Sequence, residues 1–250
     1  MIQIDRLISE FKRIRELGYV QSHRRHNTGI GKTFEDYLGI DENNLKDPDF
    51  GGIEIKTQRQ MAASKITLFT KCPSNPKGAN AILKDTYGYP DRIFKDINVL
   101  HTSIFGDRFN CTQNKYGFKL KIEYEDKIVR FLVKHLSNNK IQETDIYWTF
   151  EDLQLCIDKK LNSLFVVFAE AKKINDIEHF HFTNAIIYHQ FKFDKFLVLL
   201  NDGIVQFDIR IGAFKTKGRS SYGKPHDHGS GFRIHRDYID SIYKQMHVID

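Results

Sequence analysis

The sequence predicts a mixed α/β protein, with helices flanking a mixed β-sheet. Two apolar patterns indicate this: in some segments apolar residues recur at three- and four-residue spacing, and elsewhere they form short runs bounded by turn residues. With 40% hydrophobic and 28% charged residues, the chain has enough apolar material for a sizeable core, which argues against global disorder. A length of 250 residues fits one large domain or two small ones.

Helical spacing is clearest near the start of the sequence, where Gly18 supplies a stop after a regular apolar stripe. The stripe consists of Ile4, Leu7, Ile8, Phe11, Ile14 and Leu17. Helices are predicted over residues 2–17, 33–38, 79–84, 150–161 and 237–247.

Short apolar runs predict the strands. These runs cover residues 53–57, 66–70, 98–104, 118–124, 128–133, 164–169, 196–200 and 204–211. The first two are candidates for pairing with each other, and Asp202-Gly203 predicts a hairpin turn between the last two. Residues 41–52 are rich in Asp, Asn, Pro and Gly and predict a loop.

Cysteine content and hydropathy exclude two classes of protein. The three cysteines, Cys72, Cys111 and Cys156, form no C-x-x-C pair, so we expect reduced thiols in a cytoplasmic protein rather than a disulfide scaffold. No basic segment followed by an apolar stretch opens the sequence, which predicts no signal peptide. The longest apolar run, residues 164–169, is far below the roughly 20 residues that span a bilayer, so no membrane is expected as a partner.

Basic residues are concentrated late in the sequence. The formal net charge is +6, and residues 209–236 alone hold seven Lys or Arg side chains against one acid, Asp227. A local positive field suits a polyanion, because phosphates that bind there release their counterions. The alternative is a solvated, flexible loop.

The segment that carries most of the chemistry runs from Asp49 to Lys56. In a strand, Glu54 and Lys56 point to the same face. The Gly51-Gly52 pair permits a sharp turn that would bring Asp49 back beside Glu54.

Two converging carboxylates call for a cation, and Mg²⁺ prefers oxygen ligands. We therefore expect Asp49, Glu54 and the carbonyl oxygen of Ile55 to hold Mg²⁺, with Mn²⁺ as a substitute. Lys56 would orient or deprotonate a water molecule beside the metal, and Glu35, on the preceding helix, would be an accessory acid. Together these groups predict a phosphodiesterase centre.

Other interpretations of these residues stay open. A Glu–Lys pair on a strand is often a solvated face, and Glu35 is equally compatible with an ordinary helix surface. The chain also holds a second pattern, Glu170-Ala171-Lys172, but its nearest upstream acid, Asp158, falls on a predicted helix. No glycine turn directs that acid at Glu170, so the first pattern is favoured.

A phosphate-binding loop is a competing interpretation of residues 29–33. Gly-Ile-Gly-Lys-Thr resembles the end of a P-loop, but His26 stands where the pattern needs a glycine, and residues 21–28 are polar rather than an apolar strand. An NTPase is therefore disfavoured. A helix N-terminus that binds a DNA phosphate is the simpler alternative.

The combined motif resembles that of the PD-(D/E)xK nuclease superfamily, and more closely its MutH-like branch and the MvaI/BcnI group of restriction endonucleases. The matching positions are Gly29-x-Gly31-x-x-x-Glu35 and Asp49-x₄-Glu54-x-Lys56. The resemblance implies a nuclease core with a DNA-recognition lobe. It makes Asp49 and Glu54 metal ligands, Lys56 the residue that handles the water, and Glu35 the accessory acid.

The resemblance also implies a function. We expect a prokaryotic type II restriction endonuclease, part of a restriction-modification system with a cognate methyltransferase that protects host DNA. It would cut double-stranded DNA with Mg²⁺ at a short, near-palindromic CC-x-GG-like site, leaving a 5′-phosphate and a 3′-hydroxyl. A monomer has one active site and would cut a duplex by successive nicks.

Sequence recognition is expected from the basic region 205–236. Asp208 and Arg210 share one face of a predicted strand and suit a G·C pair, because Arg pairs with guanine and Asp accepts from cytosine; a cross-strand salt bridge is the alternative. The Gly-rich segment that follows offers further groove and phosphate contacts. These are Lys217, Arg219, Tyr222, His226, His228 and Arg233. Arg59 and Lys65, beside the catalytic strands, are expected to contact phosphates.

The domain expectation follows from these assignments. Residues 1–110 would form the catalytic part and 111–250 the rest of the body, with a single domain as the alternative. Two rival functions stay open: a MutH-like strand-nicking repair endonuclease and a DNA-binding module without catalysis.

Overall fold

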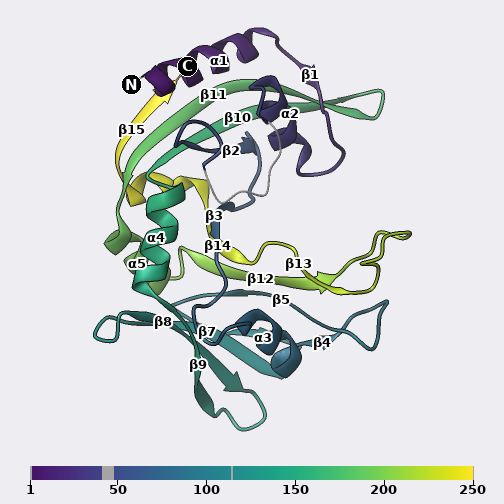
Figure 1. Ribbon diagram of the computed structural model, residues 1–250, viewed down its shortest axis with the longest axis vertical. Coiled ribbons are helices and arrows are strands. Elements are labelled where there is room, and N and C mark those ends of the chain that lie inside the picture. The colour runs from purple at the N-terminus through teal and green to yellow at the C-terminus, as the bar shows by residue number, and fades with distance from the viewer. Residues whose placement is uncertain (1, 41–47, 114, 250) are drawn as a thin grey trace. The chain divides into compact units, whose positions relative to one another are not determined.

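The computed structural model describes residues 2–40, 48–113 and 115–249, and it shows the predicted mixture of helices and sheets (Figure 1). The helices in these ranges are α1 (Ile2–Glu16), α2 (Gly29–Tyr37), α3 (Ala79–Tyr87), α4 (Phe150–Lys160), α5 (Phe193–Asn201) and the 3₁₀-helix η1 (Arg236–Ile242). Most of the predicted loop 41–52 lies outside the described residues.

The strands follow the predicted runs at most positions. Their bounds are β1 (Val20–Gln21), β2 (Glu54–Arg59), β3 (Ile66–Thr70), β4 (Tyr89–Pro90), β5 (Asn98–Ile104), β6 (Asn110–Thr112), β7 (Tyr116–Glu123), β8 (Ile128–His135), β9 (Ile141–Thr149), β10 (Ser163–Ile174), β11 (Ile177–Phe191), β12 (Gln206–Ala213), β13 (Pro225–Asp227), β14 (Gly231–Ile234) and β15 (Tyr243–Ile249).

The chain divides into two compact units, each assembled from separated segments. The first unit comprises Met1–Ile66, Ile157–Lys192 and Ile239–Asp250, and the second comprises Thr67–Cys156 and Phe193–Tyr238. This division differs from the expected one at residue 110, because late strands return to complete the sheet that early residues begin.

A mixed sheet forms the centre of the first unit. Its order is β1-β11-β10-β2, and β15 also pairs with β11. The long β10–β11 hairpin is antiparallel, whereas β2 runs parallel to β10. Parallel pairing requires a long connection, and here about a hundred residues separate the two strands, which places most of the second unit between them in the sequence.

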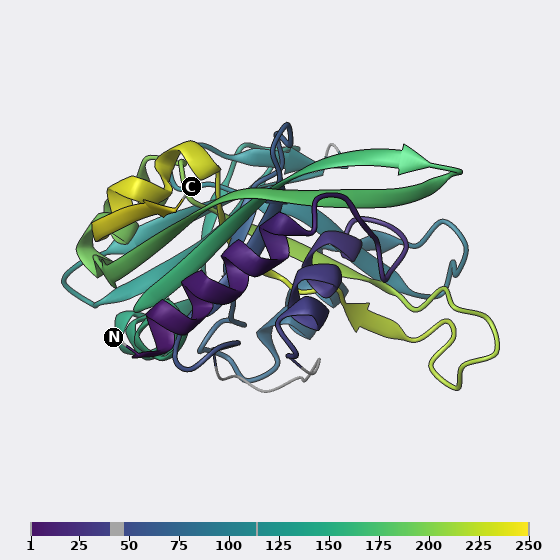
Figure 2. The same ribbon diagram turned by 90° about the horizontal axis from the view of Figure 1, so that it is seen from above.

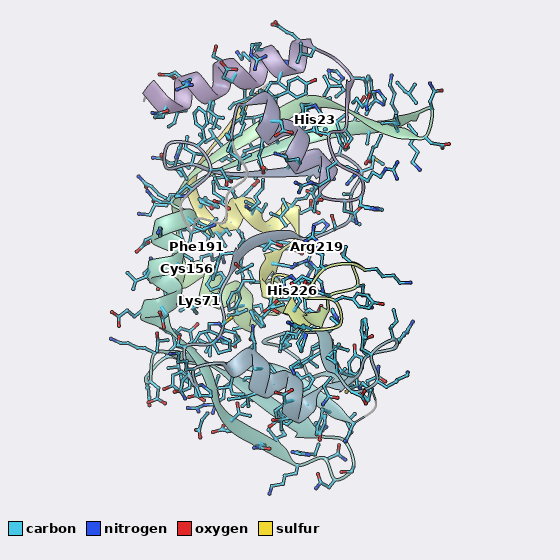
Figure 3. All side chains as sticks on the ribbon, turned by 45° about the vertical axis from the view of Figure 1, so that its right-hand side comes forward. His23, Lys71, Cys156, Phe191, Arg219 and His226 are labelled. Atoms are coloured by element: carbon cyan, nitrogen blue, oxygen red, sulfur yellow. The ribbon has the colours of Figure 1, made fainter. Side chains whose placement is uncertain are left out.

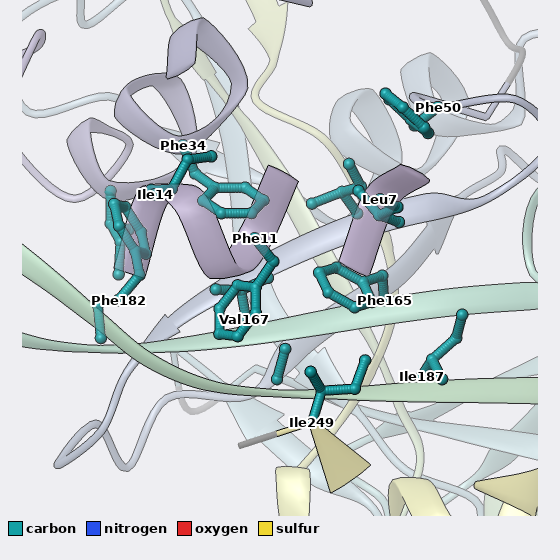
Figure 4. Packing of buried hydrophobic residues seen from close by; sticks show 14 of the residues in the cluster. Leu7, Phe11, Ile14, Phe34, Phe50, Phe165, Val167, Phe182, Ile187 and Ile249 are labelled. Atoms are coloured by element: carbon teal, nitrogen blue, oxygen red, sulfur yellow. The ribbon is translucent and has the colours of Figure 1, made fainter. Parts of the chain in front are cut away.

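Helices α1 and α2 cover one face of this sheet. Figure 2 shows α1 running along β10 and β11 with α2 beside it. Their buried side chains meet those of the sheet in one hydrophobic cluster (Figure 4). The ring of Phe11 lies 5.9 Å from that of Phe165, and the ring of Phe34 lies 5.0 Å from that of Phe182. This packing holds α2 beside β2.

The second unit contains two further sheets. One has the order β3-β14-β12-β5-β4, with β13 added to β12, and the other has the order β6-β7-β8-β9. Aromatic side chains fill its core: the ring of Trp148 lies 4.7 Å from Phe207 and 5.5 Å from Phe232. The Trp148 indole N–H donates to the carbonyl of Lys71, so its one polar group is satisfied.

One predicted strand pair is wrong. The strands at 53–57 and 66–70 exist as β2 and β3, but β2 pairs with β10 and β3 pairs with β14. Both strands are only five or six residues long, which is too short for their pattern to specify a partner, and each is paired in a different sheet.

The predicted strand over 196–200 is a helix. Within α5, Phe196, Leu197, Leu199 and Leu200 are buried while Val198 is exposed, which is a helical pattern that a short apolar run conceals. Asp202-Gly203 is accordingly no hairpin turn. Gly203, with φ +70°, follows the end of α5, and the N–H of Ile204 donates to the carbonyl of Leu199.

The predicted C-terminal helix over 237–247 is also wrong. Its first part forms η1 and its second part forms β15, which pairs with β11 from Tyr243↔Phe191 to Ile249↔Ala185. The available edge of β11 decides the outcome, because extended pairing satisfies the backbone N–H and C=O groups there.

Two exclusions made from the sequence can be compared with the structure. All three cysteines lie in the described ranges and none forms a disulfide bond. In the described part of the chain, no helix is long and apolar enough to cross a membrane.

The packing of α2 on the sheet predicts a stability effect. Phe34 is fully buried, so Phe34→Ala should lower the free energy of unfolding by about 3–5 kcal/mol through lost burial and a residual cavity. Urea denaturation of both proteins measures the difference. Leu155→Ala, at a position 61% exposed, is the matched control and should change it by less than about 0.5 kcal/mol. Equal losses would contradict the packing described here.

Candidate functional site

A two-residue turn shapes the entry to β2. Phe50 and Ile53 exchange two backbone hydrogen bonds of 3.0 and 2.9 Å around Gly51 and Gly52. These glycines have φ values of +53° and +90°, a left-handed pairing that tight hairpins favour and that side chains disfavour. The turn reverses the chain, so Asp49 lies alongside the beginning of β2.

Asp49 is tied to that strand by a hydrogen bond. Its Oδ2 accepts from the backbone N–H of Ile55 at 2.9 Å. In a strand, the N–H and C=O of one residue point to the same side. The carbonyl of Ile55 therefore points toward the edge of β2 on which the Asp49 carboxylate lies, as a shared ligand set requires.

Glu54 and Lys56 point to the opposite face from Ile55, because side chains alternate along a strand. Glu54 is only 4% exposed, and the ammonium group of Lys56 donates to its Oε1. The other oxygen, Oε2, is buried and has no hydrogen-bond partner among the residues that the structure describes. An unpartnered carboxylate oxygen in a buried place is costly, and a cation removes that cost.

The donor set fits a hard divalent cation. It consists of the Asp49 and Glu54 carboxylates and the Ile55 carbonyl, all oxygen ligands of the kind that Mg²⁺ takes. Within the described ranges, no three side chains of His, Cys, Asp or Glu gather closely enough to hold a metal. The backbone carbonyl is therefore essential to this set.

Glu35 lies on α2 beside β2. A Cβ built on Gly31 would lie 3.8 Å from Glu35 Oε1 and 3.4 Å from Thr57 Oγ1, so the small glycine lets this turn of the helix approach the strand. Thr57 faces the helices, whereas Glu54 and Lys56 face away from them. The structure thus brings Glu35 to β2 without joining it to Asp49 and Glu54 in one carboxylate group.

The segment resembling a P-loop is the first turn of α2. Thr33 Oγ1 donates to the carbonyl of Gly29 and accepts from the N–H of His23, and Lys32 forms an ion pair with Asp36 at 2.6 Å. Thr33 and Lys32 therefore have their polar partners within the first unit. The helix starts at Gly29, four residues before its predicted start.

The second Glu–Lys pattern packs around one tyrosine. Tyr19 donates to Glu170 Oε2 at 2.7 Å, and the Lys172 ammonium lies 3.6 Å from the centre of the Tyr19 ring. This hydroxyl contact, with burial second, raises the pKa of Tyr19. Glu170 and Lys172 are exposed and serve a local contact at the surface.

Arg59 and Lys65 flank β2 and β3 in different settings. The Arg59 guanidinium makes a two-pronged ion pair with Glu178, at 2.8 Å for each hydrogen bond, and lies 5.4 Å from the centre of the Phe180 ring. A phosphate would have to compete with Glu178 for it. Lys65 is half-buried at the beginning of β3.

Asp208 and Arg210 share one face of β12 but do not share a partner. Asp208 Oδ1 accepts from the side-chain amide of Gln206 at 2.6 Å, and its Oδ2 lies 3.2 Å from Arg233 Nε. The cross-strand salt bridge thus joins Asp208 to Arg233 of β14. Arg210 is exposed and lies opposite His101 of β5 in the sheet register.

Three histidines gather beside Arg210, and we call them the histidine cluster: His101, His226 and His228. The rings of His226 and His228 lie 4.6 Å apart. A Cβ built on Gly212 would lie 3.0 Å from His228 Nε2 and 3.1 Å from His101 Nε2, so both rings close over a glycine of β12. His226 also stacks on Phe214, with ring centres 3.9 Å apart.

Asp227 holds the segment that carries these histidines. Its Oδ1 accepts from the N–H groups of Gly229 and Ser230 and from the Ser230 hydroxyl, and its Oδ2 accepts from Asn80. The turn after β13 is therefore fixed from both sides. In the loop between β12 and β13, Lys217 and Arg219 are exposed, and Figure 3 shows the position of Arg219. Tyr222 packs edge-on against Phe94, with ring centres 5.1 Å apart.

Two members of the histidine cluster have depressed basicity. Burial, then the charges of Arg210 and Lys215, lowers the pKa of His101 below 6.5. Burial, then the neighbouring His226, His101 and Arg210, lowers the pKa of His228 below 6.5. At pH 7 both rings are mainly neutral, and a neutral imidazole offers one donor and one acceptor.

His101 was missed by the sequence argument. Its strand was predicted, but the place of that strand beside β12, about a hundred residues later, was not. Side-chain alternation along the strand predicts which residues share a face with His101. Nothing in the sequence specifies the register between β5 and β12 that places His101 opposite Arg210.

Comparison with known proteins adds a decisive observation. The sequence profile of the MvaI/BcnI restriction endonuclease family matches residues 8–243, nearly the whole chain. The chain belongs to the MvaI/BcnI restriction endonuclease family. It is therefore a restriction endonuclease, a site-specific deoxyribonuclease, and the expected family is confirmed. A comparison with curated protein sequences finds no match.

Solved structures of one family member resemble this chain throughout. Restriction endonuclease MvaI in complex with its cognate DNA substrate is 36% identical with a TM-score of 0.91, covering 98% of each chain. MvaI in the absence of DNA is 35% identical with a TM-score of 0.63, covering 99% of this chain and 98% of the other. The mixed α/β fold of this MvaI/BcnI family member is accordingly PD-(D/E)xK-like, as predicted.

The lowered pKa values of His101 and His228 predict a pH effect. Unfolding restores the ordinary pKa of 6.5, so the unfolded chain binds protons first as the pH falls. Both residues should therefore lower the free energy of unfolding progressively as the pH falls below about 6.5, and they should have little effect on it at higher pH. NMR titration of the ring protons measures the two pKa values directly, and a midpoint at or above 6.5 for either ring would contradict the described environment.

Proposed function

We propose that this restriction endonuclease is a Mg²⁺-dependent type II enzyme that hydrolyses double-stranded DNA at a short, near-palindromic CC-x-GG-like site. The observation that carries the proposal is the start of β2. There Asp49 is returned to the strand, and Glu54 keeps one buried oxygen without a partner while Lys56 binds the other. That arrangement has the oxygen ligands and the base that phosphodiester hydrolysis needs.

Asp49, Glu54 and the Ile55 carbonyl are the residues that would hold the ion, with Mn²⁺ as a substitute for Mg²⁺. Family members generally depend on a divalent metal. The bound ion supplies two kinds of chemistry: it polarises a phosphate oxygen and makes a water molecule more acidic. The unpartnered Glu54 Oε2 supports this assignment, because the cation gives the buried oxygen the partner that it lacks.

Lys56 has the role of orienting the attacking water, or of deprotonating it, and it can take up that proton only after its ammonium group has lost one of its own. Its hydrogen bond to Glu54 keeps the ammonium group at the carboxylate, on the same face of β2. Attack of water at phosphorus with departure of the 3′ oxygen leaves a 5′-phosphate and a 3′-hydroxyl. Glu35, on α2 beside β2, serves as an accessory acid.

DNA recognition is assigned to the face of β12 and its neighbours. Arg210 is exposed there, so its guanidinium is available for guanine, while neutral imidazoles of the histidine cluster suit base edges. Asp208 and Arg233 act as a pair. The adjacent loop contacts the sugar-phosphate backbone through Lys217, Arg219 and Tyr222. Near the cut, Lys65 contacts the backbone, and so does Arg59 once it is released from its ion pair with Glu178.

The biological setting follows from the family. The solved relative is a complex of MvaI with its cognate DNA substrate, which supports duplex DNA as the partner of this chain. We propose a monomer that cuts the two strands in successive nicks, together with a methyltransferase that protects host DNA at the same site.

Removal of a proposed metal ligand should abolish cleavage. Glu54→Ala and Asp49→Ala should each lower the cleavage rate by more than about 100-fold, while DNA affinity without metal stays near wild type. The measurement is digestion of a sequenced supercoiled plasmid with Mg²⁺ or EDTA, followed by sequencing of the cut ends. Glu170→Ala, in the surface pair at Tyr19, is the matched control and should cut normally. Retained cleavage in the Glu54 variant would overturn the site.

Removal of Arg210 should change specificity. Arg210→Ala should weaken binding to the cognate site by about 1–3 kcal/mol and leave binding to random DNA much less affected. Lys217→Ala is the control, because an exposed phosphate contact should weaken both kinds of DNA alike and reduce the salt dependence of binding. Fluorescence anisotropy at two salt concentrations separates these results. Equal loss on both DNAs for Arg210→Ala would exclude base readout by this residue.

A further inference from the structure

Among the described residues of the first unit, three buried side-chain atoms lack hydrogen-bond partners: the acceptors Glu54 Oε2 and Gln58 Oε1, and the hydroxyl of Tyr243, a donor. The charged acceptor, Glu54 Oε2, and the Tyr243 hydroxyl have complementary chemistry. Their residues are only 4% and 3% exposed. Buried polar groups are almost always hydrogen-bonded, so each unpartnered atom calls for a physical explanation.

The sheet register places the two residues on the same face. Glu54 of β2 is paired with Leu164 of β10, which is paired with Tyr188 of β11. Side chains in one such row point to the same side of the sheet, here the side opposite α1 and α2. The ring of Tyr243 packs on the ring of Tyr188 with centres 5.2 Å apart and planes at 34°. Tyr243 therefore lies on the face into which Glu54 points.

The electrostatics agree with this placement. Burial, followed by the negative charge of Glu54, raises the pKa of Tyr243 well above its usual value. The phenol thus remains protonated and keeps its donor at any pH at which a nuclease works. After burial, the Glu54 carboxylate has the largest effect on the pKa of this hydroxyl.

Tyr188 provides a contrast within the same cluster. Its hydroxyl donates to Asp240 Oδ1 at 2.8 Å, so this donor is satisfied by a structural partner. Tyr243 is as deeply buried but has no such carboxylate of its own. A purely structural tyrosine at position 243 would be better replaced by phenylalanine, because an unpaired buried hydroxyl is destabilising.

We infer that Tyr243 is a positioning residue for the catalytic carboxylate: its O–H donates to one bound water molecule, which in turn donates to Glu54 Oε2, since the two atoms make no direct hydrogen bond. This inference rests on the proposed metal site. A carboxylate oxygen has two lone pairs, so Oε2 can accept from this water molecule while it binds a cation. With Lys56 on Oε1 and the water molecule held by Tyr243 on Oε2, both oxygens of Glu54 are held in a fixed orientation.

The expected effect follows from the behaviour of hydrogen bonds to metal-binding carboxylates. Loss of such an outer partner typically lowers metal affinity or activity by about 10- to 100-fold. Tyr243→Phe removes only the hydroxyl and keeps the ring that packs on Tyr188 and Phe191. It should weaken Mn²⁺ binding and slow single-turnover cleavage by about tenfold or more, without loss of thermal stability.

The experiment compares the full-length wild type with Tyr243→Phe and Tyr188→Phe. Mn²⁺ affinity is measured by electron paramagnetic resonance of the free ion, cleavage by single-turnover digestion, DNA affinity by anisotropy in EDTA, and Tm by calorimetry. Tyr188→Phe, which leaves Asp240 without its partner, should lower Tm while metal affinity and rate stay within about twofold of wild type.

The outcomes separate the two proposals. Weaker Mn²⁺ binding together with slower cleavage for Tyr243→Phe, at unchanged DNA affinity, supports the inference. A raised Tm with metal affinity and rate within about twofold of wild type overturns it, because the hydroxyl is then only a packing defect. A slower rate with unchanged Mn²⁺ binding also overturns it. Failure of the wild type to cut DNA or bind Mn²⁺ would instead remove the proposed metal site.

Discussion

The hydrogen bond from the Ile55 N–H to the Asp49 carboxylate is the contact on which the geometry of the proposed metal site depends. It fixes the first carboxylate at the edge of β2 and leaves the Ile55 carbonyl directed to the same edge. The two glycines before it supply the left-handed turn that makes this return possible. Any side chain at these glycines would have to adopt a conformation that L-residues disfavour, and the carboxylate would leave the strand.

Glu54 is a buried acid in the proposed metal site, and its two oxygens have different surroundings. Its carboxylate is buried, one oxygen binds Lys56, and the other has no partner among the described residues. The helices on the other face of the sheet, through Phe11 and Phe34, provide the packing that keeps β2 in place despite this local cost. The proposed cation and the inferred contact with Tyr243 would both act on this oxygen, and either would offset the cost of its burial.

In the second unit, hydrogen-bond donors and acceptors are held in fixed positions on the surface of a sheet. Asp208 is tied to Arg233, and Asp227 fixes the turn behind two histidines, so Arg210 is left exposed beside neutral imidazoles. A fixed arrangement of this kind costs little ordering entropy when DNA binds. Gly212 is necessary to it, because the rings of His101 and His228 approach its backbone closely.

The proposed catalytic motif could be predicted from the sequence, because Asp49, the glycine turn, Glu54 and Lys56 lie within eight residues and strand alternation places them. The mixed α/β class and the family could be predicted as well. Pairing between distant segments could not: this applies to β2 beside β10, His101 beside Arg210, and Tyr243 on the face of Glu54. Periodicity specifies which face of a strand is buried, whereas the choice of neighbour depends on edges and packing that form only when the whole chain folds.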